Sequence, residues 1–188
     1  MTAFVTRCVR CRQQRCVCAA IAPVETRTRF LIVRHRAERS RLSNTGHFAA
    51  LALAGCQLLE YGDREARFDD ESLQAGPGTA LLFPGGATTP PTPPPQRVIV
   101  LDGSWSQARR MRQRIAALRG VPLLTLPPPD AARRRLRRAP HSDGMSTLEA
   151  IAGAVALLEG PAPAAALERL FDAIVAAGAA GGRRARAV

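Results

Sequence analysis

The chain contains no lysine, so all 27 of its basic side chains are arginines. It also has no run of about 18 uncharged apolar residues, the length that a membrane-spanning helix needs. A charged residue, Arg7, stands beside Cys8 where a secretory leader would carry its apolar segment. We therefore expect no leader peptide and no membrane partner, and we predict a cytoplasmic protein.

The arginines far outnumber the 15 acidic residues and give a formal net charge of +12. A planar guanidinium suits bidentate contact with phosphate and stacking on bases. This charge balance favours a polyanionic partner, with RNA or DNA as the first expectation. The alternative is a compositional bias toward arginine and alanine, which would give a basic surface without any ligand.

Four of the five cysteines, Cys8, Cys11, Cys16 and Cys18, lie close together near the amino terminus. Two close pairs separated by a short turn can surround one tetrahedral zinc ion, and four sulfur ligands make such a site structural. An iron–sulfur cluster and free thiols are the alternatives. The fifth, Cys56, stands apart and is expected to be a small buried residue.

A chain of 188 residues with 46% hydrophobic content can bury one good core, and no internal repeat or linker indicates a second full domain. Short apolar runs predict strands, and apolar residues at spacings of three and four predict helices between them. This alternation is typical of an α/β domain with a parallel sheet. Strands are expected at residues 30–33, 58–61, 79–83, 97–101 and 121–126, and helices at 48–54, 105–118, 150–158 and 165–177.

The fourth of these strands runs into Asp102, Ser104 and the chain's only tryptophan, Trp105. Ligands of open α/β sheets bind at the carboxyl ends of the strands, so these side chains are candidates for a functional site. The alternative is that Asp102 and Ser104 supply caps for the next helix and that Trp105 fills the core.

Other polar segments can each be interpreted either as part of a functional site or as a local structural feature. His35 and Glu38 follow the first predicted strand, where they form either part of a site or a local hydrogen bond. Asn44 begins a helix by its position, and Ser146 with Glu149 forms a capping box ahead of another. The block of five arginines in residues 133–138 indicates either a solvated charge run or a grip on RNA phosphate, which we favour.

Five segments, in this order along the chain, resemble the DTW-domain family, the tRNA-uridine aminocarboxypropyltransferases. The cysteine pairs are similar to the family's metal knuckle. Residues 35–38 and 43–46 are similar to its His-Pro-x-Glu and Asn-Thr segment, and residues 82–85 to its Leu-x-Pro loop. Residues 102–105 stand where members commonly read Asp-x-Thr-Trp, and residues 146–150 are similar to its Ser-Thr-x-Glu-Ala segment. Two positions depart from the pattern: Ser104 replaces a threonine, and Arg36 replaces a proline.

The resemblance implies a SPOUT-like α/β fold, with helices on both faces of a parallel sheet and a C-terminal trefoil knot. It divides the chain into a zinc knuckle at residues 1–24, a catalytic domain at 25–178 and a basic tail at 179–188. It further implies transfer of the 3-amino-3-carboxypropyl group of S-adenosylmethionine to N3 of a tRNA uridine, with methylthioadenosine as the other product. DNA is not expected as a partner, and the oligomeric state is left open.

The resemblance also assigns roles to residues. Asp102, Ser104 and Trp105 are expected at the reaction centre, where Asp102 accepts or orients the N3 proton or else binds the donor. The expected donor-binding residues are Leu82, Phe83, Pro84, Gly85, Leu101, Asp102, Gly103, Ser146, Thr147, Leu148 and Glu149. The expected RNA-binding residues are His35, Glu38, Arg39, Asn44, Arg109, Arg110, Arg133, Arg134, Arg135, Arg137 and Arg138.

Two other functions are compatible with the sequence. A SPOUT-type RNA methyltransferase would use the same donor and transfer its methyl group. A non-catalytic zinc protein would need only the cysteines and the arginines to bind RNA.

Overall fold

The computed structural model describes residues 7–63, 65, 67–89, 91–129 and 144–180. Its centre is a five-stranded sheet in the order β2-β1-β4-β3-β5, in which every pair of neighbours is parallel. The predicted α/β class and parallel sheet are confirmed. The strands are β1 (Arg29–His35), β2 (Gln57–Tyr61), β3 (Thr79–Leu82), β4 (Arg97–Asp102) and β5 (Leu123–Leu124).

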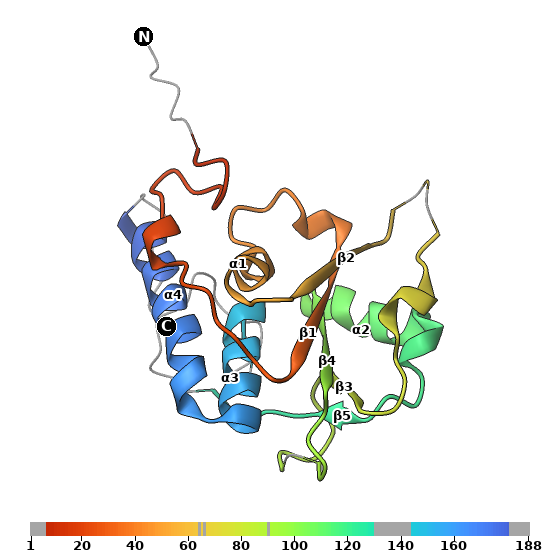
Figure 1. Cartoon of the computed structure of the whole chain (residues 1–188). Helices are drawn as coiled ribbons and strands as arrows, with labels where there is room; N and C mark the ends of the chain where they lie inside the picture. Colours follow the sequence, from red (N-terminus) through yellow and green to blue (C-terminus); the bar gives the residue numbers. More distant parts are fainter. Residues whose placement is uncertain (1–6, 64, 66, 90, 130–143, 181–188) are drawn as a thin grey trace.

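Helices cover both faces of this sheet (Figure 1). On one face lie α1 (Thr45–Ala52), α3 (Thr147–Glu159) and α4 (Pro161–Ala180), and on the other lies α2 (Trp105–Arg114). Short 3-10 turns occur at Cys18–Ala20, Arg36–Glu38, Asp70–Leu73 and Ala116–Leu118. No helix among the described residues is long and apolar enough to cross a membrane.

Alternate residues of the central strands enter two different cores. In β1, Phe30 and Ile32 pack with α1, α3 and α4, whereas Leu31 and Val33 pack with α2. Successive side chains of a strand point to opposite faces, so a strand covered on both sides needs an unbroken apolar run. This is why β1 and β4 read as continuous hydrophobic segments.

Three of the helices begin where the sequence predicts, whereas α4 begins at Pro161, four residues before the predicted start. Asn44 accepts a hydrogen bond from the backbone N–H of His47 at 2.8 Å, and complete capping boxes form at Ser104 and at Ser146. The helix after β4 is shorter than predicted, because Ile115 adopts extended backbone and a 3-10 turn follows. Ile115 and Leu118 nevertheless remain buried in the core beneath α2.

The cysteine segment is part of the main body of the fold. Cys11, Val17 and Ile21 are buried in the same core as α1, α3 and α4. The domain boundary expected at residue 24 stays a prediction, as do the C-terminal knot and the SPOUT relationship. Residues 130–143, between β5 and α3, and the tail at 181–188 lie outside the described residues.

Candidate functional site: a cavity at the carboxyl ends of the strands

A cavity of about 220 Å³ lies at the carboxyl ends of β3, β4 and β5, against the first turn of α3. A single buried water needs only about 15 Å³, so this space is on the scale of a small-molecule site. The residues that line it are Leu82, Phe83, Pro84, Val100, Leu101, Gly103, Trp105, Ala108, Leu124, Thr125, Leu126, Pro127, Pro128, Met145, Ser146, Thr147 and Ala150.

Three of the predicted donor-binding segments meet at this cavity. Its lining includes Leu82, Phe83 and Pro84 after β3, Leu101 and Gly103 around the end of β4, and Ser146 and Thr147 at the start of α3. The remaining predicted donor-binding residues, Gly85, Asp102, Leu148 and Glu149, are not among its lining residues. Glu149 instead completes the α3 capping box through a 2.9 Å bond from the backbone N–H of Ser146, and Leu148 is fully buried.

Two aromatic rings stand on the cavity wall. Trp105, in the first turn of α2, meets Phe83 edge to face with 6.3 Å between ring centroids. The guanidinium carbon of Arg112 lies 4.9 Å from the centre of the Phe83 ring. The predicted residue Ser104 is not among the lining residues; it is exposed and serves as the N-cap of α2.

Sequence reasoning missed one wall of the cavity, which is formed by residues 125–128 and Met145. The Thr125 hydroxyl donates to the carbonyl of Phe83 at 2.9 Å and accepts from the backbone N–H of Gly86 at 2.8 Å. Thr125 therefore fastens the loop after β3 to the chain after β5. Only the position of these residues directly after an edge strand could have indicated their role.

Asp102 lies behind the cavity wall. It is 3% exposed, and its carboxylate accepts 2.6 Å hydrogen bonds from Nδ2 of Asn44 and from the hydroxyl of Thr147. The Thr45 hydroxyl beside Asn44 accepts a 3.3 Å bond from the backbone N–H of Leu148. The carboxylate thus joins the end of β4 to the first turns of α1 and α3.

Gly46 shows how closely α1 approaches this carboxylate. A Cβ at Gly46 would lie 2.6 Å from Oδ2 of Asp102 and 2.7 Å from its Cγ. Contacts this short do not occur between real Cβ atoms and their neighbours. In the Asn-Thr-Gly sequence Asn44 caps α1, the Thr45 hydroxyl accepts a hydrogen bond, and the absence of a side chain at Gly46 leaves space for the Asp102 carboxylate.

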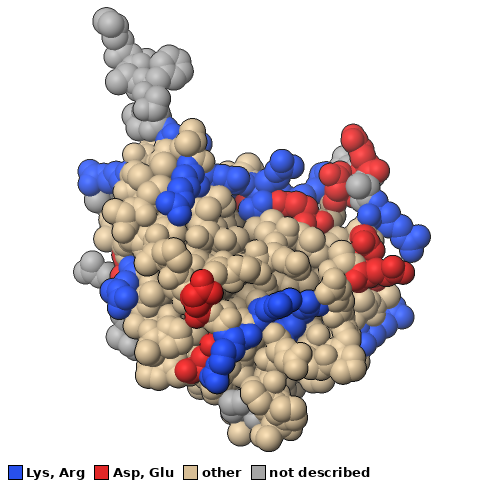
Figure 2. All heavy atoms as spheres, viewed as in Figure 1, with Lys and Arg blue, Asp and Glu red and all other residues tan. Residues whose placement is uncertain are grey.

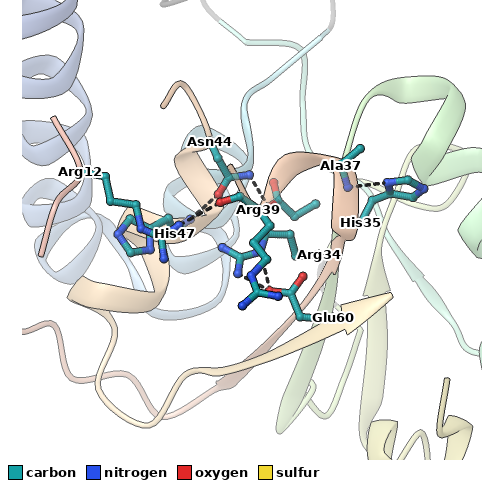
Figure 3. Close-up of polar contacts among 9 residues, drawn as sticks. Arg12, Arg34, His35, Ala37, Arg39, Asn44, His47 and Glu60 are labelled. Carbon is teal, nitrogen blue, oxygen red and sulfur yellow. Dashed lines mark hydrogen bonds and ion pairs between the residues drawn. The ribbon is translucent and has the colours of Figure 1, made fainter. Parts of the chain in front are cut away.

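Positively polarised groups lie around Asp102. Two helix N-termini, those of α1 and α3, direct the positive ends of their dipoles toward this region. Arg34 is the register partner of Asp102 in β1 and is 5% exposed, with its guanidinium paired to Glu60 in β2 (Figure 3). A buried carboxylate held this way is suited to fixing the geometry of the cavity.

The predicted RNA-binding residues after β1 have several different contacts. The ring of His35 accepts a 3.2 Å bond at Nδ1 from the backbone N–H of Ala37, and its Cβ lies beside Gly103 at the cavity (Figure 3). Burial, together with the nearby positive charge of Arg110, lowers the pKa of His35. Glu38 is 2% exposed and pairs with Arg41 at 3.4 Å, so it helps to shape the loop.

Three of the predicted RNA-binding arginines are exposed on segments near the site. Arg39 follows the turn at Arg36–Glu38, and Arg109 and Arg110 stand on α2. Figure 2 shows arginine side chains gathered along the upper edge of the molecule, over the cysteine segment and its neighbours. Arg133, Arg134, Arg135, Arg137 and Arg138 lie outside the described residues.

The four clustered cysteines form a candidate metal centre. The sulfur atoms of Cys8, Cys11, Cys16 and Cys18 all lie within 4.8 Å of one another, with 3.6 Å between Cys8 and Cys18 and 3.9 Å between Cys11 and Cys16. A tetrahedron with zinc–sulfur bonds of about 2.3 Å has edges of about 3.8 Å. Backbone hydrogen bonds from Cys11 and Arg10 lower the pKa of Cys8 to about 6, whereas burial and the neighbouring thiols raise the pKa of Cys18 to about 12. The four residues fit a tetrahedral thiolate-bound ion.

The cysteine segment is fastened to the loop that leads into α1 (Figure 3). Arg12 donates from Nη1 to the carbonyl of Arg39 at 2.9 Å, and Gln13 donates to the carbonyl of Leu42 at 2.6 Å. The ring of His47 in α1 also lies 2.9 Å from the carbonyl of Arg10. These contacts support the segment that ends at Asn44, and hence the position of Asp102.

Comparisons with known proteins agree with the motif pattern. A family model described as "DTW domain" matches residues 5–178. A mouse (Mus musculus) protein named tRNA-uridine aminocarboxypropyltransferase 2 is 28% identical over 167 residues, which cover 81% of this chain and 56% of the mouse protein. A Macaca fascicularis protein of the same name is 27% identical over 168 residues, with the same coverage. The chain thus spans about half the length of these curated relatives. No solved structure matches it.

Proposed function

This chain belongs to the DTW domain family, and we propose that it transfers the 3-amino-3-carboxypropyl group of S-adenosylmethionine to N3 of a uridine in tRNA. The name of its relatives, tRNA-uridine aminocarboxypropyltransferase 2, supports this reaction. The net charge of +12, carried by arginines, suits an RNA substrate.

The main evidence for the proposal is which segments of the chain form the cavity wall. The loop after β3, the end of β4 and the start of α3 are far apart in the sequence, yet all three contribute residues to one cavity of about 220 Å³. These are the segments whose motifs resemble the family. The carboxyl edge of a parallel sheet is the general position for small ligands in α/β proteins.

The reaction exchanges one bond for another. A bond forms between N3 of uracil and the γ-carbon of the donor, while the bond between that carbon and the sulfonium sulfur breaks. Sulfur keeps the electron pair and leaves as neutral 5′-methylthioadenosine, and the N3 proton passes to a base or to water. The same sulfur also carries a methyl group, so the enzyme must select the γ-carbon by holding it in line with N3.

The walls of the cavity suit such a donor. Trp105 and Phe83 present aromatic rings, whose faces attract a sulfonium or ammonium cation. The apolar side chains of Leu82, Leu101 and Leu126 exclude water and can contact the adenosine. We assign donor binding to this cavity and uridine binding to its rim beside Gly103 and His35.

We assign Asp102 a positioning role. Its carboxylate touches Asn44 and Thr147, and Thr147 itself lines the cavity. An ionised Asp102 would therefore act through the orientation of Thr147 and of α3. The sequence alone also suggested that Asp102 accepts the N3 proton. In that role the carboxylate would have to break its hydrogen bonds to Asn44 and Thr147.

Cys8, Cys11, Cys16 and Cys18 would hold one zinc ion, with all four coordination positions filled by sulfur. A closed site of this kind stabilises the fold and has no open position for a reacting water. Its contribution to the reaction is indirect, through the loop that carries Asn44.

The test is mass analysis of nucleosides from tRNA incubated with the purified protein and S-adenosylmethionine. We expect a modified uridine heavier by about 101 Da, the mass of the aminocarboxypropyl group less one proton, together with release of methylthioadenosine. A gain of about 14 Da would identify a methyltransferase instead. If the protein binds RNA but shows no saturable binding of S-adenosylmethionine, the remaining interpretation is a non-catalytic zinc protein.

A further inference from the structure

A second cavity, of about 440 Å³, lies at the opposite edge of the sheet and has no role in the proposed reaction. Its walls come from the beginnings of β1, β2 and β4 and from the loop that contains Gly55. Three arginines line it: Arg27, Arg29 and Arg97. No acidic side chain is among the described residues that line this cavity, so the charged groups of its lining are all arginines.

Two of these arginines stand side by side. Arg29 and Arg97 are register partners on the neighbouring strands β1 and β4, which lie about 5 Å apart in a sheet. Within the described part of the chain, neither of them forms an ion pair. Like charges on adjacent strands repel each other, and a bound anion would convert this repulsion into attraction.

The guanidinium of Arg97 is held in place by the protein. Its Nη1 donates to the carbonyl of Gln74 at 3.1 Å and to that of Leu73 at 3.4 Å. A guanidinium has five N–H donors, so these bonds fix the group without using all of its donors. A fixed guanidinium loses little conformational entropy when it binds a ligand.

Arg27 extends the same basic site to the surface. Its side chain is 82% exposed and forms an ion pair with Glu159 at 3.8 Å. That carboxylate already accepts 2.9 Å and 2.8 Å bonds from the backbone N–H groups of Arg27 and Thr28. Glu159 therefore anchors the chain ahead of β1.

We propose that this cavity binds a phosphate group of the RNA backbone. The inference rests on the proposed function and adds a contact to it. Figure 2 shows arginine side chains over the start of β1, with acidic side chains beside them, on the same face as the basic upper edge, so one RNA molecule can reach both. The seven residues of β1 separate the two edges of the sheet by about 20 Å, a distance that a folded RNA spans easily.

The test compares Arg29→Ala and Arg29→Glu with Arg169→Ala, which removes an exposed arginine from α4 and leaves the cavity intact. Affinity for tRNA is measured for each variant across a range of salt concentrations, and donor binding is measured by calorimetry. We expect Arg29→Ala to weaken tRNA binding about three- to fivefold and to reduce the salt slope by about one. Arg29→Glu should weaken binding further, Arg169→Ala should match the wild type, and donor binding should be unchanged.

Three results would overturn the proposal. Equal tRNA affinity and equal salt slope for Arg29→Ala and the wild type would show that RNA does not use this cavity. Pyrophosphate binding that Arg29→Ala abolishes, with tRNA binding unaffected, would assign the cavity to a small phosphorylated molecule. A wild-type protein that binds the donor but not tRNA would refute the proposed function itself, before any variant is compared.

Discussion

The hydroxyl of Thr147 donates a 2.6 Å hydrogen bond to Asp102, which lies 45 residues earlier in the chain. Through this bond the first turn of α3 is fixed to the end of β4, and both segments line the same cavity. Asn44 completes the arrangement from α1, with a bond of the same length to the other carboxylate oxygen. The shape of the cavity therefore depends on a carboxylate that does not line it.

Asp102→Ala and Asp102→Asn should behave differently. Alanine leaves the Asn44 amide and the Thr147 hydroxyl without their acceptor, so we expect the free energy of unfolding to fall by at least about 2 kcal/mol. Asparagine can accept from Asn44 and donate to the rotated Thr147 hydroxyl, so it should retain most of the stability and transfer activity. Denaturant titrations and kcat and KM values check this. A folded, donor-binding Asp102→Asn protein without turnover would instead give the carboxylate a direct part in the chemistry.

Gly46→Ala should disrupt the same network from the side of α1. The added methyl group would lie 2.6 Å from Oδ2 of Asp102, so either the carboxylate or the helix must move. We expect a loss of about 1–3 kcal/mol in unfolding free energy, with reduced donor affinity. Gly76→Ala is the matched control, because its methyl group would meet no atom within 4 Å. Equal stability of the two variants would contradict the close packing at Gly46.

Trp105 allows donor binding to be measured directly, because it is the only tryptophan in the chain and lines the cavity. Titration with S-adenosylmethionine should change its fluorescence in a saturable way. Trp105→Ala should weaken donor binding about three- to thirtyfold, as expected for loss of an aromatic contact to a cation. Calorimetry of this variant and of Trp105→Phe checks the prediction. Unchanged affinity in the alanine variant would place the donor elsewhere.

The cysteine cluster should bind one metal ion per chain. Cys11→Ser should lower the metal content and the melting temperature, because Cys11 is both a candidate ligand and a buried core residue. Cys56→Ser is the control, since Cys56 lies outside the cluster. Elemental analysis of the purified proteins checks the stoichiometry. Full metal content in Cys11→Ser would exclude this residue as a ligand.

The stability of the protein should decrease in mild acid, and His35 should contribute to this. Burial and Arg110 lower the pKa of His35 below 6.5, so the unfolded chain takes up a proton at a higher pH than the folded chain does. The contribution of His35 is therefore present above pH 6.5 and is lost as the pH falls through its folded pKa. Protonation also removes the acceptor for the N–H of Ala37.

His35→Asn supplies an acceptor that does not titrate at these pH values. Unfolding free energies measured from pH 7.5 to pH 5 should fall less steeply for this variant than for the wild type. NMR titration of the wild type should place the pKa of His35 below 6.5. A steeper decline in the variant would contradict the assignment.

The sequence predicted the parts of this molecule that depend on local patterns. Apolar runs located every strand, and Asn44, Ser104 and Ser146 located the starts of three helices. The strand-end rule also predicted that the segment after β4 contributes to a site, and the resemblance to the family added the loop after β3. These features depend on residues that are close together in the chain.

The features that sequence reasoning missed depend on long-range contacts. Asp102 and Asn44 are separated by 58 residues, and no spacing rule indicates that the amide reaches the carboxylate. The wall at residues 125–128 has no periodicity, because a short edge strand is followed, two residues later, by consecutive prolines. The basic cavity likewise requires the register of β1 against β4, which pairs Arg29 with Arg97.

The bonds from Arg12 and Gln13 to the loop ahead of Asn44 have a practical consequence for anyone who purifies this protein. If the four cysteines hold the proposed zinc ion, a batch in which only some molecules carry it would contain copies that hold this loop with different firmness. Under the proposed function, turnover per milligram would then rise with the zinc-to-protein ratio, and adding zinc would restore the missing part.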